Sequence, residues 1–176
     1  MISNRNLVII GCAMLAAVLY RQEQRMEQIE HKLDDIIEIK ETVKYTKNDL
    51  ECLTKNIYYE AGVEDHRGKF AVAHVTLNRL KTGYWGKSIC QVVYAKSQFS
   101  WTLLKTLPKP NPKIWAESES IAKSTLAGYR VRGLKKSLYY HATYIKNPKW
   151  ADKTQEAGQI GKHVFYNRAK NSNIQI

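Results

Sequence analysis

The hydrophobic pattern of this 176-residue chain changes from a helical period to a strand-like one at about residue 128. Before this point apolar residues recur every three or four positions, which is typical of helices that bury one face. After it, two stretches are rich in Tyr, Val, Phe and Thr, which is typical of strands. Helices followed by a small sheet predict the α+β class. The predicted helices span 48–62, 66–81, 88–95 and 111–127, and the predicted strands span 137–145 and 162–168.

Two segments precede this pattern. Residues 7–20 form an uncharged apolar run of fourteen residues. A stable membrane-spanning helix needs about 20 apolar residues, so we expect residues 1–20 to be an uncleaved signal-anchor that holds the inner membrane weakly. Residues 21–47 are polar and predict a helical, coiled-coil-like linker, which either self-associates through residues 26–50 or packs on its own domain. Its heptad spacing runs through Met26, Ile29, Leu33, Ile36, Lys40, Val43, Lys47 and Leu50.

The net charge of +12 is concentrated in the last part of the chain. Residues 52–176 hold 21 Lys and Arg against seven Asp and Glu, whereas residues 21–51 are net acidic. Such a basic surface favours a polyanionic partner, which is nucleic acid, anionic lipid or the anionic envelope. We expect no nucleic-acid partner, because the sequence has no Cys/His zinc spacing, helix-turn-helix signature or RNP-like strand. We expect no cofactor and no metal.

Glu60 is the most suggestive titratable residue. It follows Leu50, Leu53 and Ile57 on one stripe of the helix that Asn48 and Glu51 are predicted to start with a capping box. A carboxyl on such a face is expected to be buried. Burial raises the pKa of a carboxyl and suits it to act as a general acid near neutral pH. The alternative is a surface glutamate without a function, which is common on helices.

Several short motifs occur in a defined order. They are Ile57-Tyr58-Tyr59-Glu60-Ala61 with Glu64, Gly68-Lys69-Phe70-Ala71-Val72-Ala73, Asn78-Arg79, Gln98-Phe99-Ser100-Trp101, Tyr139-Tyr140-His141-Ala142, Pro148-Lys149-Trp150 and His163-Val164-Phe165-Tyr166. Together they resemble the SleB-type cell-wall hydrolases over residues 50–168. Two departures, Gly62-Val63 for Arg-Gly and Lys69 for Gln, lie beside Glu60 and bear on fine specificity.

The resemblance implies a lysozyme-like domain at residues 48–176, mostly helical with a small antiparallel sheet. It also implies cleavage of peptidoglycan between N-acetylmuramic acid and N-acetylglucosamine, with Glu60 as the acid. Glu64 is the nearest second carboxylate in sequence and is either a partner of Glu60 or a structural group. Without a second carboxylate, attack by the muramic 6-hydroxyl gives a 1,6-anhydro product, so both muramidase and lytic transglycosylase remain open.

Aromatic and amide side chains within these motifs are candidates for sugar contacts. We expect the substrate to lie against Gln98, Ser100, Trp101, Tyr140, His141, Trp150 and His163. Tyr140 and His141 alternate on a predicted strand, so one of them should face the cleft and the other the core. Phe99 is expected in the core, Asn78 is expected to hydrogen-bond near Glu60, and Arg79 is expected to form a structural ion pair.

The three cysteines, Cys12, Cys52 and Cys90, form no disulfide framework by spacing and are expected to be small buried apolar side chains. The N-terminus is also similar to that of phage signal-anchor-release endolysins. That resemblance implies a membrane-tethered enzyme facing the periplasm, in which Cys12 could pair with Cys52 once the anchor leaves the bilayer.

Three functional hypotheses follow. The first is a phage endolysin that lyses its host, and the second is a bacterial enzyme of the same chemistry that remodels the wall. The third is a non-enzymatic, membrane-anchored wall-binding protein, for which Glu60 would be dispensable. An amidase or peptidase is not supported, because no metal-ligand cluster and no family-like Cys/His arrangement are present in the sequence.

Overall fold

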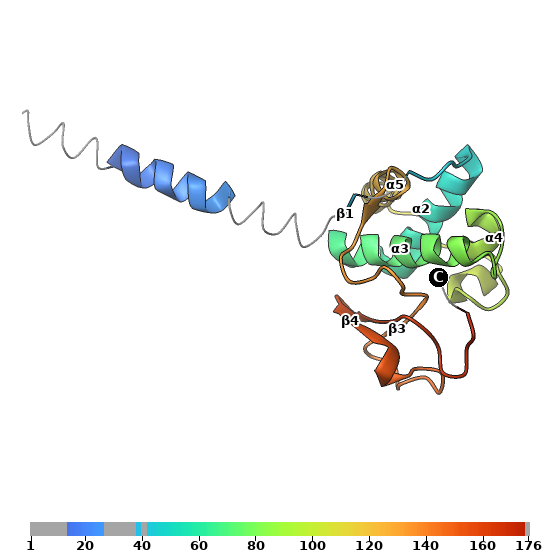
Figure 1. Ribbon diagram of the computed structural model, residues 1–176. Coiled ribbons are helices and arrows are strands. Elements are labelled where there is room, and N and C mark those ends of the chain that lie inside the picture. Colours follow the sequence, from blue (N-terminus) through green and yellow to red (C-terminus); the bar gives the residue numbers. More distant parts are fainter. Residues whose placement is uncertain (1–13, 27–37, 40–41, 175–176) are drawn as a thin grey trace, which may run out of the picture. The chain divides into compact units, whose positions relative to one another are not determined.

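The computed structural model describes residues 14–26, 38–39 and 42–174, and the chain divides into two compact units, residues 1–36 and 37–176 (Figure 1). In the first unit, residues 14–26 form a helix whose side chains are all exposed. Residues 7–13, the first half of the predicted anchor, lie outside the described residues. Among the described residues, no helix is both long and apolar enough to span a bilayer.

The described residues of the second unit form four α-helices, a three-stranded sheet and a two-stranded sheet. The helices are α2 (Lys47–Ala61), α3 (His66–Thr82), α4 (Ile89–Val93) and α5 (Pro112–Leu126), with the short 3-10 helices η1 (Ser100–Leu103) and η2 (Lys153–Gln155). The strands are β1 (Glu38–Ile39), β2 (Tyr129–Arg130), β3 (Tyr139–Ala142), β4 (Glu156–Ile160) and β5 (His163–Tyr166). The four predicted helices and the two predicted strands are therefore confirmed, whereas β4 and the β1–β2 pair were not predicted.

Local capping explains where the helices begin and end. Thr46 and Asp49 form the capping box of α2, two residues before the predicted cap at Asn48. Gly83 closes α3 in the left-handed region at φ 65°, which favours glycine. Asn111 accepts hydrogen bonds from the backbone of Lys113 and Ile114 and so caps α5 before Pro112.

Helix α3 is the central element, as its apolar sequence predicted. One side contributes Ala73 and Leu77 to a core shared with α2, α4 and α5. The other contributes Ala71 and Val75 to a second core beneath the sheet. The second core also contains Val131, Leu134, Ile160 and Phe165. Helix α2, which carries Glu60 near its end, packs on α3, and Tyr140 of β3 packs against both cores.

The sheet that faces the helices has the antiparallel order β3-β5-β4. Strand β5 lies in the centre, so Tyr140 of β3 pairs with Phe165 and His141 pairs with Val164. A register irregularity between Glu156 and Gly158 interrupts the β4 edge. Phe165 is fully buried beneath the sheet, which fixes the face on which the Tyr140 ring lies.

The predicted helical linker is wrong over its last part. Residues 38–39 form β1, which pairs antiparallel with β2, and the Val43 amide donates a hydrogen bond to the Leu126 carbonyl at the end of α5. Val43 and Leu50 pack on the core of the second unit, in line with the alternative that this segment packs on its own domain. Residues 27–37 and 40–41 of the heptad pattern lie outside the described residues, and self-association stays a prediction.

Cys52 and Cys90 form a disulfide that joins α2 to α4. The prediction that these cysteines are unpaired side chains is therefore wrong. The spacing of 38 residues gave no sign of the pairing, because contact between α2 and α4 arises only in the folded domain. Cys12 lies outside the described residues, and Cys52 is already disulfide-bonded to Cys90.

Candidate active site

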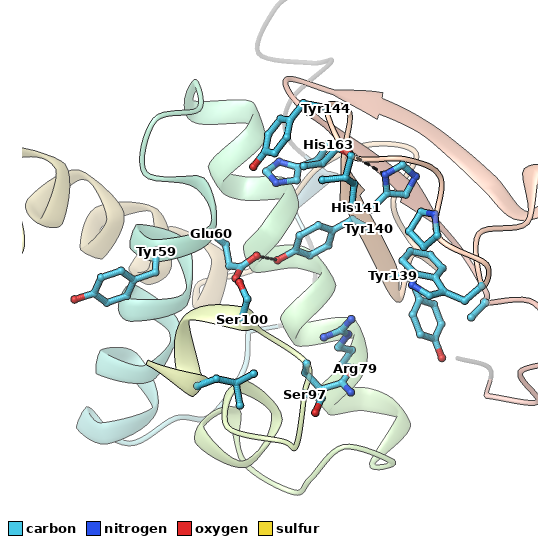
Figure 2. A pocket seen from close by; sticks show the side chains of 17 residues that line it. Tyr59, Glu60, Arg79, Ser97, Ser100, Tyr139, Tyr140, His141, Tyr144 and His163 are labelled. Atoms are coloured by element: carbon cyan, nitrogen blue, oxygen red, sulfur yellow. Dashed lines mark hydrogen bonds between the residues drawn. The ribbon is translucent and has the colours of Figure 1, made fainter. Parts of the chain in front are cut away.

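A cleft of about 740 Å³ opens between the helices and the sheet. It is bounded by the end of α2, by α3, by the segment around η1, and by β3 with the loop that follows it (Figure 2). The lining residues are Tyr59, Glu60, Arg79, Ser97, Gln98, Ser100, Leu103, Tyr139, Tyr140, His141, Ala142, Tyr144, Ile145, Pro148, Trp150, His163 and Ala169. Among the described residues, Glu60 is the only carboxylate and Arg79 the only lysine or arginine in this lining.

Glu60 projects from the last turn of α2 into this cleft and meets Tyr140 from β3 (Figure 2). The Tyr140 hydroxyl donates a hydrogen bond of 3.1 Å to Oε2 of Glu60. Burial raises the pKa of Glu60, while the Tyr140 hydrogen bond and the positive charge of Arg79 oppose this rise. A carboxyl in this state holds its proton to higher pH than a free glutamate, so it can donate that proton to a bound oxygen.

The surroundings of Tyr140 keep its hydroxyl protonated, so that it remains a hydrogen-bond donor. Burial, reinforced by the neighbouring Glu60 charge, keeps the pKa of Tyr140 well above its usual range, so the phenol remains protonated. Its ring packs against Phe165 below and lies edge-on to His163. The orientation of the Glu60 carboxyl therefore depends on a residue that is itself fixed by the sheet.

Arg79 is a buried cation without a carboxylate partner among the described residues. Its side chain is 5% exposed, and Nε donates to the Leu138 carbonyl at 2.8 Å. The guanidinium lies over the rings of Trp85 and Phe99, with Tyr139 somewhat farther away. The predicted structural ion pair of Arg79 is therefore wrong, and aromatic faces take the place of an anion.

His141, His163 and Trp150 form the sheet side of the cleft. Nδ1 of His141 lies 3.0 Å from the Ala142 carbonyl, which only accepts, so Nδ1 is the donor; Nε2 lies 3.1 Å from the Tyr166 hydroxyl. Burial lowers the pKa of His163, whose Nδ1 has no partner among the residues described. Both Tyr140 and His141 line the cleft, so the prediction that one of them faces only the core is wrong.

The 97–101 segment divides between cleft and core. Gln98 and Ser100 line the cleft, as expected. Trp101 is buried, donates from Nε1 to Oδ1 of Asn56 and stacks on Tyr59, so the structure places it in the core instead of the cleft. Phe99 is a core residue, which confirms that prediction.

Two further candidate site residues, Asn78 and Glu64, hydrogen-bond to the backbone and support the fold. Asn78 donates to the carbonyls of Leu134 and Ser137 and does not hydrogen-bond near Glu60, which corrects the prediction. Glu64 is 9% exposed, accepts from the Lys162 amide at 3.0 Å and is not among the lining residues. A Cβ at Gly161 would collide with the Glu64 carboxylate, so Glu64 is packed tightly against the turn between β4 and β5.

Some cleft residues were not predicted from the sequence. Tyr139 belongs to a sequence motif but was not assigned to the cleft, and Ser97, Leu103, Tyr144 and Ile145 lie in segments without a distinctive pattern. Tyr144 is 81% exposed at the rim. It lies two residues after the end of β3, inside the predicted strand 137–145, so the sequence offered no separate signal for its place at the cleft. Within the described part of the chain, no group of three or more metal-ligating side chains occurs.

Comparison with known proteins gives the family. The family model described as "Cell Wall Hydrolase" matches residues 63–166, which is more than half of the chain. The chain belongs to the cell wall hydrolase family. The match begins three residues after Glu60 and includes Tyr140, His141 and His163.

Curated relatives of this family member are larger proteins. A spore cortex-lytic enzyme of Oceanobacillus iheyensis is 27% identical over 125 residues, which cover 69% of this chain and 42% of the relative. A spore cortex-lytic enzyme of Bacillus subtilis is 24% identical over 124 residues, which cover 69% of this chain and 38% of the relative. The chain thus spans less than half the length of these relatives.

Solved structures share the fold. The catalytic domain of the Bacillus cereus SleB protein matches with a TM-score of 0.57 at 23% identity, covering 70% of this chain and 92% of that domain. The catalytic domain of the germination-specific lytic transglycosylase SleB from Bacillus anthracis matches with a TM-score of 0.56 at 25% identity, covering 69% and 96%. The helix-rich domain with a small antiparallel sheet and the resemblance to SleB-type proteins are confirmed.

Proposed function

We propose that this chain cleaves the glycan strands of peptidoglycan as a lytic transglycosylase, with Glu60 first as general acid and then as general base. The observation that carries the proposal is that Glu60 is the only carboxylate among the described residues that line the cleft. Hydrolysis by a glycosidase ordinarily uses two carboxylates beside the bond. Here the nearest one in sequence, Glu64, is engaged by the Lys162 amide outside the lining.

The chemistry needs one proton carrier. Protonated Glu60 donates its proton to the glycosidic oxygen that leaves with N-acetylglucosamine, and the bond from this oxygen to C1 of N-acetylmuramic acid breaks. The 6-hydroxyl of the same muramic residue then forms a bond to C1, and its proton passes to the Glu60 carboxylate. No water is consumed, Glu60 is restored, and the products are a 1,6-anhydromuramic end and a free N-acetylglucosamine end.

Residues around the cleft favour both forms of Glu60 that the cycle needs, the protonated acid and the carboxylate. Burial, which raises the pKa of Glu60, favours the proton-bearing form that starts the reaction. The Tyr140 hydroxyl and the Arg79 charge favour the carboxylate that follows proton donation. The description of the Bacillus anthracis domain as a lytic transglycosylase agrees with this assignment.

The test is mass spectrometry of muropeptides released from purified peptidoglycan by the full-length protein. We expect anhydromuramic ends with the wild type and none with Glu60→Gln, which keeps the shape of the side chain. Glu64→Gln is the matched control, because it makes the same change four residues away at a carboxylate outside the lining. This variant should form the same anhydro product.

Other products would identify other mechanisms. Reducing muramic ends would contradict transglycosylation and indicate hydrolysis. If Glu64→Gln then abolished cleavage, Glu64 would be the second carboxylate. Absence of cleavage by a folded wild-type protein would favour the wall-binding alternative. Cleavage by Glu60→Gln at the wild-type rate would exclude Glu60 as the acid.

For the biological setting we propose host lysis by a phage endolysin, tethered to the inner membrane through residues 7–20 and facing the periplasm. The apolar run and the basic last part of the chain support this setting. A disulfide between Cys52 and Cys90 agrees with an oxidising compartment. Wall remodelling by a bacterial host enzyme is the alternative. Expression with and without residues 1–20, followed by fractionation and lysis timing, distinguishes membrane tethering from free export.

A further inference from the structure

Arg79 has more donors than the protein uses. Nε is bonded to the Leu138 carbonyl, but Nη1 is buried and has no partner among the described residues. No acidic side chain of the described part of the chain lies within ion-pair distance of it. Figure 2 shows the side chain extending from α3 into the cleft that also contains Glu60. A guanidinium with unpaired donors at such a position is a ready partner for a carboxylate.

The net charge of the cleft favours the binding of an anion. Glu60 is the only acidic group among its described lining residues, and in the form that starts the proposed reaction this carboxyl is neutral. Arg79 stays charged, since burial lowers the pKa of a guanidinium from a value far above neutrality. The cleft therefore carries a net positive charge before the reaction. A buried cation is unfavourable unless it is paired, and the Trp85 and Phe99 faces compensate it only in part.

We propose that Arg79 binds a carboxylate of the substrate, so that the cleft distinguishes muramic residues by the charge they carry near the bond that is cut. This inference rests on the proposed function, and it adds the chemical class that the cleft selects. Peptidoglycan offers two sources of this group. One is the lactyl carboxylate of a muramic residue without a stem peptide, and the other is a carboxylate of the stem peptide itself.

A second explanation is that Arg79 acts only on Glu60. Its charge does favour the Glu60 carboxylate, but Arg79 and Glu60 share no hydrogen bond and Glu60 is bonded to Tyr140 instead. An effect through Glu60 would change the cleavage of every substrate by the same factor. Recognition of a carboxylate would change only substrates that carry one. The two explanations therefore differ in a ratio of rates and not in the absolute rate.

The experiment uses the full-length protein and two glycan preparations, one freed of stem peptides by an amidase and one with its peptides. Each is tested as isolated and after its carboxylates are converted to methyl amides. We expect neutralisation of one preparation to lower the wild-type kcat/KM about 10- to 100-fold, as for a charge-assisted hydrogen bond. A loss confined to the peptide-free strands identifies the lactyl source, and a loss confined to the peptide-bearing strands identifies the stem-peptide source.

In Arg79→Gln the ratio between charged and neutralised strands should fall to about one, whatever the absolute rate of the variant. Arg79→Lys should retain part of the ratio, because it keeps the charge without the fork of donors. Arg132→Gln is the matched control at an exposed arginine outside the cleft lining and should keep the wild-type ratio. Circular dichroism checks that each variant is folded.

Two results would overturn the proposal. One is a wild-type enzyme that does not distinguish charged from neutralised strands in either preparation. The other is an Arg79→Gln variant that keeps the full ratio. If Arg79→Gln does not fold, wild-type inhibition by N-acetylmuramic acid and by its methyl amide decides, with the free acid expected to bind more tightly. If no strand is cleaved at all, the proposed function fails, and direct titration with these two sugars still tests the Arg79 site.

Discussion

The Tyr140 hydroxyl and the Glu60 carboxyl are joined by a hydrogen bond of 3.1 Å across 80 residues of sequence. The bond connects the end of α2 to the first strand of the three-stranded sheet, so it spans the cleft between the two layers (Figure 2). Its geometry lets one hydroxyl both orient the carboxyl and favour its ionised form.

Tyr140→Phe should shift the pH dependence of cleavage to higher pH. The Tyr140 hydrogen bond lowers the pKa of Glu60, so its removal raises that pKa further. A general acid acts in its protonated form, and the alkaline limb of kcat/KM therefore moves upward. At the optimum we expect about a 5- to 10-fold loss, as for one hydrogen bond. An unchanged pH profile would show that Tyr140 does not influence Glu60.

Glu60→Gln should make the protein more stable at neutral pH. Burial raises the folded-state pKa of Glu60 above its unfolded value. The stabilisation associated with its proton is then present at acid pH and lost as the pH rises through the folded-state pKa. Thermal unfolding at pH 8 should show a melting temperature a few degrees higher for Glu60→Gln, since about 1 kcal/mol corresponds to roughly 2–4 °C.

The same comparison at a pH below the ordinary glutamate pKa supplies the control for this prediction. Glu60 is then protonated in both the folded and the unfolded chain, and the difference between the two proteins should nearly vanish. Equal stabilities at both pH values would mean that the carboxyl is as well solvated in the cleft as in the unfolded chain.

Loss of the Cys52–Cys90 disulfide should destabilise the second unit strongly. The bond closes a loop of 38 residues, for which the chain-entropy account gives about 4 kcal/mol. The double variant Cys52→Ala/Cys90→Ala should therefore melt roughly 8–16 °C lower. Cys12→Ser is the control and should keep the wild-type melting temperature. If Cys12→Ser instead lowered the melting temperature as the double variant does, Cys12 would be shown to contribute to a stabilising disulfide.

Trp101→Phe should mainly lower stability, whereas Trp150→Phe should mainly weaken substrate binding. Trp101 donates to Asn56, which donates in turn to Thr76, so its loss leaves Oδ1 of Asn56 buried without that partner. We expect about 1–3 kcal/mol less stability in urea unfolding and little change in KM. Trp150 lines the cleft, and its variant should mainly raise KM for glycan strands. The reverse pattern would place Trp101 against the substrate.

The helices were predictable because each is specified by local signals. The apolar period of α3, the glycine after it and the Asn111-Pro112 start of α5 all act within a few residues. Strand β4 was missed because Gly158 and the register irregularity interrupt its alternation. The β1–β2 pair was missed because two-residue strands have no period, and the heptad spacing across residues 38–47 suggested a helix instead.

The candidate site was predictable to the extent that sequence motifs imply contact. Glu60 follows from a charge at the end of an apolar stripe, and its meeting with Tyr140 depends on how the sheet packs on α3. The same applies to Arg79, for which the sequence offered no sign that aromatic rings would replace a carboxylate partner. Trp101 was assigned to the cleft because it belongs to a polar and aromatic motif. Its polar neighbours do not reveal whether the indole points into the cleft or into the core.

The attachment of the segment before α2 has a mechanical consequence. Strand β1 is paired with β2, and the Val43 amide is bonded to the end of α5, before the chain turns into the helix that carries Glu60. Tension that enters through the N-terminal residues is thus transmitted first to α5 and β2. Helix α2 is further fastened to α4 through Cys52 and Cys90. A pull on the chain from its N-terminal side would load these attachments before it reached α2 and the Glu60 end of the cleft.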